Sequence, residues 1–321
     1  MSSIQFTSLT NVLLDAQNQV FVDACNNDQY LYNMLLKEGP SSPSGSVWQF
    51  INARPTAAAF VEGGVFKSPD KFTQAKAELP PGYIHQVLSM TGKTQDALRN
   101  SSALQVANWL MRQYKVGAES MINLIEEGIY GGTMSGGEFV GLATAIDDGN
   151  TYAGVDRSTE SKFRAFTDDN GGTPRALTMA LLHTVYTGLT QTNRGKFTHI
   201  FASPTQCNAW RALAADVQRL GGQVQVTGNV YEQVNGVGTQ IFGNSGIWFH
   251  GIQVTEIPGY PTDRIDFIDL SPANISLEVF RPFTVAPAER INDDMVWDMT
   301  MALSMPLREP RKGAARLGAL S

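Results

Sequence analysis

Glycine-rich motifs that could hold a phosphate or a catalytic nucleophile occur at three places in the chain. A phosphate-binding loop needs a glycine, four further residues and then Gly-Lys-Ser/Thr. Residues 92–94 supply the end of that pattern, but Val87 stands where its first glycine belongs, and after residues 132–137 Glu138 replaces the lysine. The segment GNSGI at residues 243–247 resembles a GxSxG nucleophile elbow but lacks the last glycine. None of the three therefore predicts nucleotide binding or nucleophilic catalysis.

The residues that could bind a metal ion are too scattered to predict a site. The four histidines have no HExxH pattern and no histidine four residues away; they are His85, His183, His199 and His250. Cys25 and Cys207 lie far apart without a CxxC motif. Residues 148–150 match the first positions of a calcium loop, but Tyr152 occupies the next ligand position. We interpret these residues as structural or solvated, and predict no catalytic residue, no metal site and no cofactor.

A basic cluster late in the chain consists of Arg308, Arg311, Lys312 and Arg316. Such a cluster could contact phosphate, but charges grouped in this way are more often a solvated or salt-bridged tail, and that is our interpretation. The chain as a whole has a net charge of −6 and a pI near 5.3. This acidic balance argues against the broad basic surface that non-specific nucleic-acid binding needs, so any contact with nucleic acid should be incidental.

Length and hydropathy predict a soluble, folded protein. With 321 residues, of which 42% are hydrophobic, the chain can bury one large core or two modest ones. Residues 1–20 lack the basic start and apolar core of a signal peptide, and no window approaches the ~18–20 apolar residues of a membrane span. We therefore expect synthesis in the cytoplasm.

The longest helical pattern runs from about residue 94 to residue 127. Apolar residues recur along it at steps of three and four: Ala103, Ala107, Leu110, Tyr114, Ala118, Met121 and Ile125. Gly128 follows, and it can adopt the left-handed conformation that ends a helix. At ~1.5 Å per residue the helix would be roughly 50 Å long. An equally long element must therefore cover its apolar side.

The clearest strand pattern lies at residues 295–305. Apolar residues occupy every second position there: Met295, Trp297, Met299, Met301, Leu303 and Met305. Their face would be ~33 Å long, which is enough to cover most of the long helix. We predict that this strand and that helix pack together, although they lie far apart in the sequence.

The remaining elements are shorter. Residues 1–38 predict one or two short helices, and residues 57–66 and 82–90 predict the two strands of a long hairpin. A helix over residues 173–192 and a buried strand over residues 197–203 come next. Ser203 and Pro204 then predict the cap and first residue of a helix that ends near Leu220. Strands and turns follow from residue 223 onward.

The order of these elements resembles that of a tailed-bacteriophage major capsid protein with the Hong Kong 97-type fold. The resemblance rests most on YGGTMSGGEFVGLATAI directly after the long helix, AGVDRSTESKFRA, KFTHIFASPTQCNAWRAL and the late LREPRKGAARLGAL. It spans nearly the whole chain and matches residues 1–38 least. It implies an α+β fold with an N-terminal arm, an extended loop, a peripheral domain with a long spine helix, and an axial domain.

The resemblance also implies domain boundaries. The N-terminal arm would comprise residues 1–40 and the extended loop residues 41–92. The peripheral domain, with the spine helix, would comprise residues 93–145, and the axial domain residues 146–276. Residues 277–321 would contain the return strands of the peripheral domain and the C-terminal segment. No long charged helical segment precedes the arm, so scaffolding would come from a separate protein.

The function implied is that of a structural protein, not an enzyme. The chain would assemble with itself, as pentamers and hexamers, into the icosahedral head shell that encloses the phage genome. It would be located in the virion capsid after assembly in the host cytoplasm. A scaffolding protein, a portal and a decoration protein are possible partners, packaged DNA would be contacted non-specifically, and no membrane would be involved. Residues expected at subunit interfaces are Phe60, Phe66, Lys67, Lys71, Lys76, Glu126, Glu127 and Arg157.

Two alternatives stay open from the sequence. An encapsulin-like nanocompartment shell would keep the fold but hold a cargo enzyme instead of DNA. An α/β enzyme built on residues 173–270 would need a pocket with convergent polar groups, and the sequence offers no candidate pair for it.

Overall fold

The computed structural model of the chain describes residues 30–53, 57, 59, 62, 73–99, 103–132, 139–220, 244–286, 289–291 and 293–321. The described chain separates into two compact units, each built from three segments. Unit 1 comprises Met1–Pro43, Pro81–Ala143 and Ser276–Met305, and unit 2 comprises Ser44–Pro80, Thr144–Ile275 and Pro306–Ser321. Within the described ranges, no helix has the length and apolar character needed to cross a membrane.

Unit 1 is built on a five-stranded sheet with β12 at its centre. The strands are β1 (Lys37–Glu38), β4 (Gly82–Met90), β10 (Leu277–Val285), β11 (Glu289–Ile291) and β12 (Asp294–Ser304). Strand β12 pairs antiparallel with β10, β11 and β4, and its pairing with β4 runs from Met295 opposite Met90 to Leu303 opposite Gly82. The short β1 pairs parallel with β10. Strands from three distant parts of the sequence thus form one sheet.

Among the described residues, the main helices of unit 1 are α2 (Tyr30–Met34), α3 (Gly92–Arg99) and α4 (Ala103–Gly131). The described parts of the predicted helix over residues 94–127 are α3 and α4, and residues 100–102 between them lie outside the described residues. The predicted end at Gly128 is wrong, because α4 continues to Gly131. Gly128 faces the Phe139 ring, which would lie 3.1 Å from a Cβ at this position. The glycine therefore serves close packing inside the helix and does not end it.

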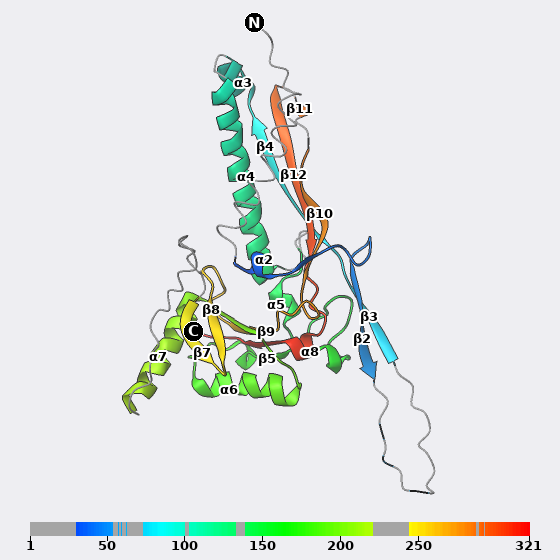
Figure 1. The fold of residues 1–321 in the computed structure, drawn as a ribbon, viewed down its shortest axis with the longest axis vertical. Helices are drawn as coiled ribbons and strands as arrows, with labels where there is room; N and C mark the ends of the chain where they lie inside the picture. Colours follow the sequence, from blue (N-terminus) through cyan, green and yellow to red (C-terminus); the bar gives the residue numbers. More distant parts are fainter. Residues whose placement is uncertain are drawn as a thin grey trace. The chain divides into compact units, whose positions relative to one another are not determined.

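Helix α4 packs on β4 (Figure 1), and its side chains also reach β12, the strand predicted from the sequence to cover it. The Tyr114 and Trp297 rings lie 6.4 Å apart in an edge-to-face arrangement. Gly117 lets the helix approach the sheet closely, since a Cβ there would lie 3.2 Å from both Leu88 and Met299. The predicted apolar stripe of the helix is buried at Leu110, Tyr114, Ala118, Met121 and Ile125. The predicted strand face is buried at Trp297, Met299, Met301, Leu303 and Met305.

Unit 2 contains a six-stranded sheet in the order β5-β13-β9-β6-β8-β7. Its strands are β5 (Phe166–Asp168), β6 (His199–Ala202), β7 (Asn244–Phe249), β8 (Ile252–Glu256), β9 (Ile265–Ile268) and β13 (Ala314–Leu317). Helices α6 (Met179–Thr187) and α7 (Pro204–Leu220) share an apolar core with the sheet, to which Leu182, Trp210 and Phe267 contribute. The predicted cap of α7 is confirmed, because the Gln206 amide donates to Ser203 Oγ at 3.3 Å. The predicted helix over residues 173–192 begins later, at Met179.

The hairpin differs from the prediction. Its strands are β2 (Ser46–Ala53) and β3 (Thr73–Leu79), which form a two-stranded sheet of their own in unit 2. Residues 82–90, predicted as the second hairpin strand, are β4 of the unit 1 sheet. The predicted first strand at residues 57–66 lies mostly outside the described residues. Alternation of apolar residues marks a strand but does not identify its partner, which explains the wrong pairing.

Residues 306–321 also group differently from the expected boundaries. They belong to unit 2, although residues 277–321 were expected to stand together as return strands and C-terminal segment. A short helix, α8 (Pro310–Gly313), precedes β13, and β13 lies between β5 and β9. The late segment therefore completes the sheet of unit 2.

Candidate interaction surfaces

The residues expected at subunit interfaces are only partly described. Phe60, Phe66, Lys67 and Lys71 lie outside the described residues. Lys76 lies on β3 with an exposed side chain, and its Nζ forms an ion pair with Glu78 Oε2 at 2.7 Å. This pair lowers the pKa of the Glu78 carboxyl. Lys76 is therefore accessible from solvent in the single chain.

Glu126 and Glu127, in the last turns of α4, have different surroundings. Glu126 is half-buried, and its Oε1 accepts hydrogen bonds from the Tyr130 hydroxyl and, at 3.5 Å, from the Leu31 amide. Burial raises the pKa of the Glu126 carboxyl in spite of these bonds. Glu126 thus connects α4 to α2 inside unit 1. Glu127 is exposed and lines a shallow cavity of about 300 Å³ with His85 and Gln86.

Arg157 does not lie on a surface. Its side chain is fully buried in unit 2, where the guanidinium donates to the carbonyl oxygens of Thr144 at 3.0 Å and Ala145 at 2.5 Å. The guanidinium carbon also lies 4.8 Å from the centre of the Tyr152 ring. Burial lowers the pKa of Arg157 to about 10. Its contacts hold the last two residues of α5 (Leu142–Ala145), so the expected interface role does not fit this position.

A buried charge network lies where β9 and β13 pair. Asp266 and Arg316 are opposite each other in the register, and Arg316 Nε donates to Asp266 Oδ1 at 2.8 Å. The Tyr260 hydroxyl also donates to Asp266, and Arg264 Nε lies 3.5 Å from Asp266 Oδ2. Burial acts to raise the pKa of Asp266, but the two arginines outweigh it and the pKa lies below its usual range. Arg316, interpreted from the sequence as part of a solvated or salt-bridged tail, is a salt-bridged residue of the sheet.

The other residues of the late basic cluster line a cavity of about 570 Å³ in unit 2. Arg308, Arg311 and Lys312 come from the segment around α8, and Lys162 and Arg194 lie across from them. Asn193 and Phe163 complete this wall of the cavity. The spacing of basic residues around residue 310 was visible in the sequence, but nothing in it placed Lys162 and Arg194 beside them.

Metal-ligating residues do not converge in the part of the chain that the structure describes, where no group of three or more His, Cys, Asp or Glu side chains could hold an ion. The nearest approach of two histidines there is His183 to His250, with ring nitrogens 3.4 Å apart. The His250 ring stacks on Tyr186 with centroids 3.8 Å apart. These rings form a surface aromatic cluster.

The geometry of the two units defines a class of fold before any particular relative is considered. A long helix on a strand-rich sheet, a separate hairpin and a second α+β unit are the parts that the sequence resemblance implied. No protein-family model and no curated protein sequence matches the chain.

Solved structures match it over most of its length. A chain of the cyanophage A-1(L) capsid asymmetric unit is 14% identical, with a TM-score of 0.64, and the match covers 91% of this chain and 93% of that one. The capsid of a native GTA particle matches at 9% identity and a TM-score of 0.57, covering 91% and 90%. The capsid of the Myoviridae phage XM1 matches at 11% identity and a TM-score of 0.55, covering 91% of each chain. The chain therefore has the α+β fold of phage capsid proteins, which is the Hong Kong 97-type fold expected from the sequence.

Proposed function

We propose that the protein is the major capsid protein of a tailed bacteriophage, a structural subunit that assembles with copies of itself into an icosahedral head shell around the genome. One observation carries this proposal: the cyanophage capsid chain matches over more than nine-tenths of both chains. A match of that extent includes both units, so it does not rest on one common substructure. The protein would act in the virion, after assembly in the host cytoplasm, without a cofactor or an enzymatic activity.

Each described part of the chain can be assigned to one domain of the capsid fold. Unit 1, with α4 on its sheet, would be the peripheral domain, and the body of unit 2 around its six-stranded sheet would be the axial domain. The β2–β3 hairpin would be the extended loop that reaches a neighbouring subunit. A two-stranded sheet buries little of itself, which is the reason to expect a partner chain for it.

Interface contacts would come from side chains that are accessible in the single chain. Lys76 on the hairpin and Glu127 on α4 are exposed, so both are retained as interface residues. Phe60, Phe66, Lys67 and Lys71, in the segment between β2 and β3, are retained for the same hairpin. Copies of the chain in pentamers and hexamers would require the same surfaces to accept two slightly different neighbours. A separate scaffolding protein, a portal and a decoration protein would be further partners.

The test is electron microscopy of the purified protein together with sizing chromatography of the same sample. We expect closed shells, capsomer rings or sheets, either from the protein alone or after co-expression with the genes that neighbour it. A protein that remained a monomer or dimer in both preparations would contradict the proposal. Portal and terminase genes beside this gene would support a phage head, whereas a cargo-enzyme gene would support a nanocompartment.

A further inference from the structure

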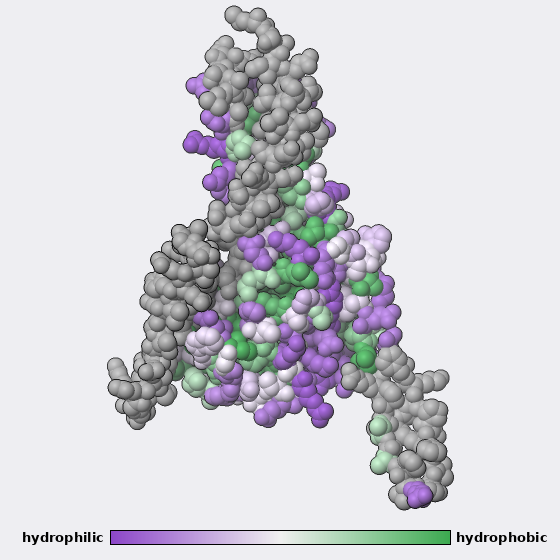
Figure 2. Space-filling view, in the orientation of Figure 1, coloured by the Kyte–Doolittle hydropathy of each residue, from purple (hydrophilic) through white to green (hydrophobic). Residues whose placement is uncertain are grey.

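The cavity in unit 2 is strongly basic. Its cationic lining residues are Lys162, Arg194, Arg308, Arg311 and Lys312, and Glu309 is the one carboxylate among the residues that line it. The chain as a whole carries a net charge of −6. A concentration of positive charge on an acidic protein focuses the electrostatic field at that place and attracts anions to it. Figure 2 shows hydrophilic residues gathered on the part of unit 2 around α8.

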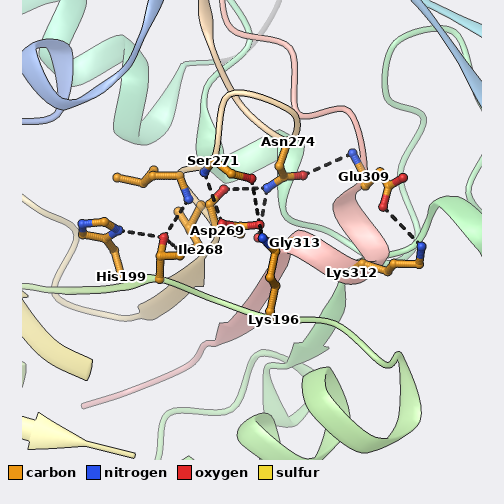
Figure 3. A network of polar contacts seen from close by, with 11 residues as sticks. Lys196, His199, Ile268, Asp269, Ser271, Asn274, Glu309, Lys312 and Gly313 are labelled. Atoms are coloured by element: carbon orange, nitrogen blue, oxygen red, sulfur yellow. Dashed lines mark hydrogen bonds and ion pairs between the residues drawn. The ribbon is translucent and has the colours of Figure 1, made fainter. Parts of the chain in front are cut away.

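The basic surface extends beyond this cavity. A second cavity of about 420 Å³ shares Arg194, Glu309 and Lys312 with the first and adds Lys196 and the carboxylate Asp269. Lys196 Nζ forms an ion pair with the buried Asp269 at 3.2 Å, which fixes the lysine at the cavity wall (Figure 3). The cationic side chains that line the two cavities outnumber the carboxylates Asp269 and Glu309, so the two cavities together form a track of net positive charge, not a single pocket. A track suits an extended ligand with repeated negative charges.

Hydrogen bonds hold the walls of the track in place. Arg311 Nε donates to Asn193 Oδ1 at 3.2 Å, and the Lys196 amide donates to the Lys312 carbonyl at 2.9 Å. Asn274 Nδ2 donates to the carbonyls of Asp269 at 2.8 Å and Gly313 at 3.2 Å, as Figure 3 shows. The α8 segment, the loop before β6 and the loop after β9 are thus joined. Cationic groups on joined walls lose little freedom when an anion binds.

The backbone at Arg194 is unusual. A π-helix at Gly188–Thr192 precedes it, and Arg194 itself has a φ of 52°, in the left-handed region that few residues other than glycine adopt. Gly195 follows and approaches the Lys312 carbonyl so closely that a Cβ would overlap it. Strained backbone of this kind concentrates at binding sites. Here it holds an exposed arginine at the point that both cavities share.

Two of the cations are accessible for binding. Arg194 and Lys162 are exposed, and neither has a hydrogen-bond or ion-pair partner among the described residues. Arg311 and Lys312 are already engaged with Asn193 and Glu309. The accessible pair should therefore contribute most of the change in affinity when charges are removed.

The lining favours a phosphate backbone over a protein partner. Protein interfaces use buried aromatic or aliphatic anchors. The large hydrophobic residues that are exposed in the described chain are Leu36, Ile51, Tyr83, Val87, Val116, Leu124 and Trp248, and none of them lines either cavity. Phe50 and Phe163 also line the first cavity, but they are buried, at 9% and 1% exposed, and stack on each other with ring centroids 4.5 Å apart. Arginine and lysine groups with no exposed apolar anchor match regularly spaced phosphates.

We propose that this basic track in unit 2 binds the phosphate backbone of nucleic acid without reading its base sequence. The choice of DNA as the polyanion rests on the proposed function, because a head shell encloses a genome. This contact is localised, in contrast to the incidental contact expected from net charge alone. The proposed track gives a binding role to Arg308, Arg311 and Lys312, the residues of the late basic cluster that do not take part in the β9–β13 ion pair.

The test is a titration of a fluorescently labelled 20-base-pair duplex with the purified protein, read by anisotropy at several salt concentrations. The site variant is Lys162→Gln/Arg194→Asn, in which asparagine tolerates the left-handed backbone. The control is Arg112→Gln/Lys115→Gln, which removes the same charge from exposed positions on α4. We expect the site variant to bind on the order of 10-fold to 100-fold more weakly at ~0.1 M salt, with the salt slope reduced by about 2. The control should bind like the wild type.

Several outcomes would overturn the inference. They are equal binding by the site variant and the wild type, an equal loss in the control variant, and displacement of DNA by polyglutamate at matched charge, which would indicate an acidic polypeptide as the partner. Displacement by millimolar inorganic phosphate alone would indicate an isolated phosphate site instead of a track. Thermal melting of both variants checks that they fold.

Electron microscopy of the same samples separates this inference from the proposed function. Shells formed by a site variant that binds DNA normally would overturn the DNA track and leave the capsid function in place. Site-dependent DNA binding by a wild-type protein that forms no shells under any condition would overturn the capsid function and support the track.

Discussion

At the scale of single residues, unit 2 depends on charges that are buried and paired. Asp266 has no exposed surface, and it lies between Arg316 and Arg264 with the Tyr260 hydroxyl donating to it. A buried carboxylate of this kind is tolerated only because its partners compensate the loss of hydration. Removing one partner should therefore cost more than removing an exposed ion pair.

Arg316→Gln should destabilise the protein by about 3–5 kcal/mol, because it leaves the Asp266 charge buried with an incomplete set of partners. Chemical denaturation followed by circular dichroism measures this loss. Arg290→Gln is the matched control, since its ion pair with Asp293 is mostly exposed, with 65% and 78% of the two side chains accessible. That variant should unfold like the wild type. Equal effects from the two substitutions would show that the Asp266 network contributes no special stability.

The same network predicts a dependence of stability on pH. The pKa of Asp266 is lower in the folded protein than its usual value, which is ~3.9 in an unfolded chain. Its ionised form therefore contributes stability that is fully present above pH ~4 and is lost as the pH falls through the folded-state pKa. Urea unfolding between pH 7 and pH 3 should show this loss. In Asp266→Asn the acid-dependent part should be smaller, and an unchanged profile would assign it to other carboxyls.

Arg157 shows why single buried charges are hard to predict from a sequence. It lies in the polar run DRSTESK, which has no apolar periodicity, so nothing in the pattern indicated burial and the residue was expected at a subunit interface. Its burial follows from the carbonyls of Thr144 and Ala145, which need donors and which only the folded chain brings near it. Arg308, Arg311 and Lys312 were recognised as a cluster because they are close in the sequence, whereas Lys162 and Arg194 join them only in the fold.

At the scale of elements, unit 1 depends on the contact of α4 with β4 and β12. The sequence predicts both α4 and β12. Apolar residues recur along the helix with the 3.6-residue helical period, and they alternate strictly along β12. The same alternation is weak in β4, where Tyr83 and Val87 are exposed. Its partner lies some two hundred residues further along the chain, and no local signal distinguishes that partner from residues 57–66, the segment predicted from the sequence to pair with it. Element types were therefore easier to predict than their pairing.

Leu110→Asp should abolish soluble folding, because it buries an unpaired charge in the helix-on-sheet contact, where Leu110 is 5% exposed. Solubility after expression and the circular dichroism spectrum measure this. Val116→Asp is the control on the same helix, since Val116 is 57% exposed, and it should stay within about 0.5 kcal/mol of the wild type. A folded Leu110→Asp protein would show that the helix does not depend on this sheet.

Gly141→Ala should destabilise unit 1 by about 1–3 kcal/mol or more. A Cβ at Gly141 would overlap the Gly128 carbonyl and lie 2.8 Å from the Ile129 carbonyl oxygen, and both are backbone atoms that cannot rotate away. Gly131→Ala is the control, because a Cβ there meets nothing within 4 Å. Thermal melting compares the two. A Gly141→Ala protein as stable as the control would show that the segment after α4 can shift to make room.

At the scale of the whole molecule, six chain segments alternate between the two units. The β2–β3 hairpin belongs to unit 2, yet its second strand is followed directly by β4 of unit 1. The sequence indicated the fold class and the separate hairpin, because these follow from composition, breaks and element order. It did not indicate that residues 306–321 return to unit 2, because a strand of four residues carries too little periodicity to be assigned.

Replacing residues 54–72 with Asn-Gly should leave the fold intact and prevent shell assembly. Ala53 and Thr73 are paired across the hairpin, so a two-residue turn can join them. The melting temperature should stay within a few degrees of the wild type, and electron microscopy should show no closed shells. Normal shells from this variant would contradict the proposal that the hairpin contacts a neighbouring subunit, and loss of folding would assign the segment to the core of its own chain.

The central position of the late strands also determines when the two sheets can form during synthesis of the chain. Strand β12 lies in the middle of one sheet and β13 lies between two strands of the other, and both come from residues 294–317. A ribosome makes these residues after all the strands that they join, so neither sheet can close on a nascent chain until they have emerged. Synthesis of these late strands would therefore set the earliest time at which a chain can join a growing shell, because an unfinished chain lacks the two folded units.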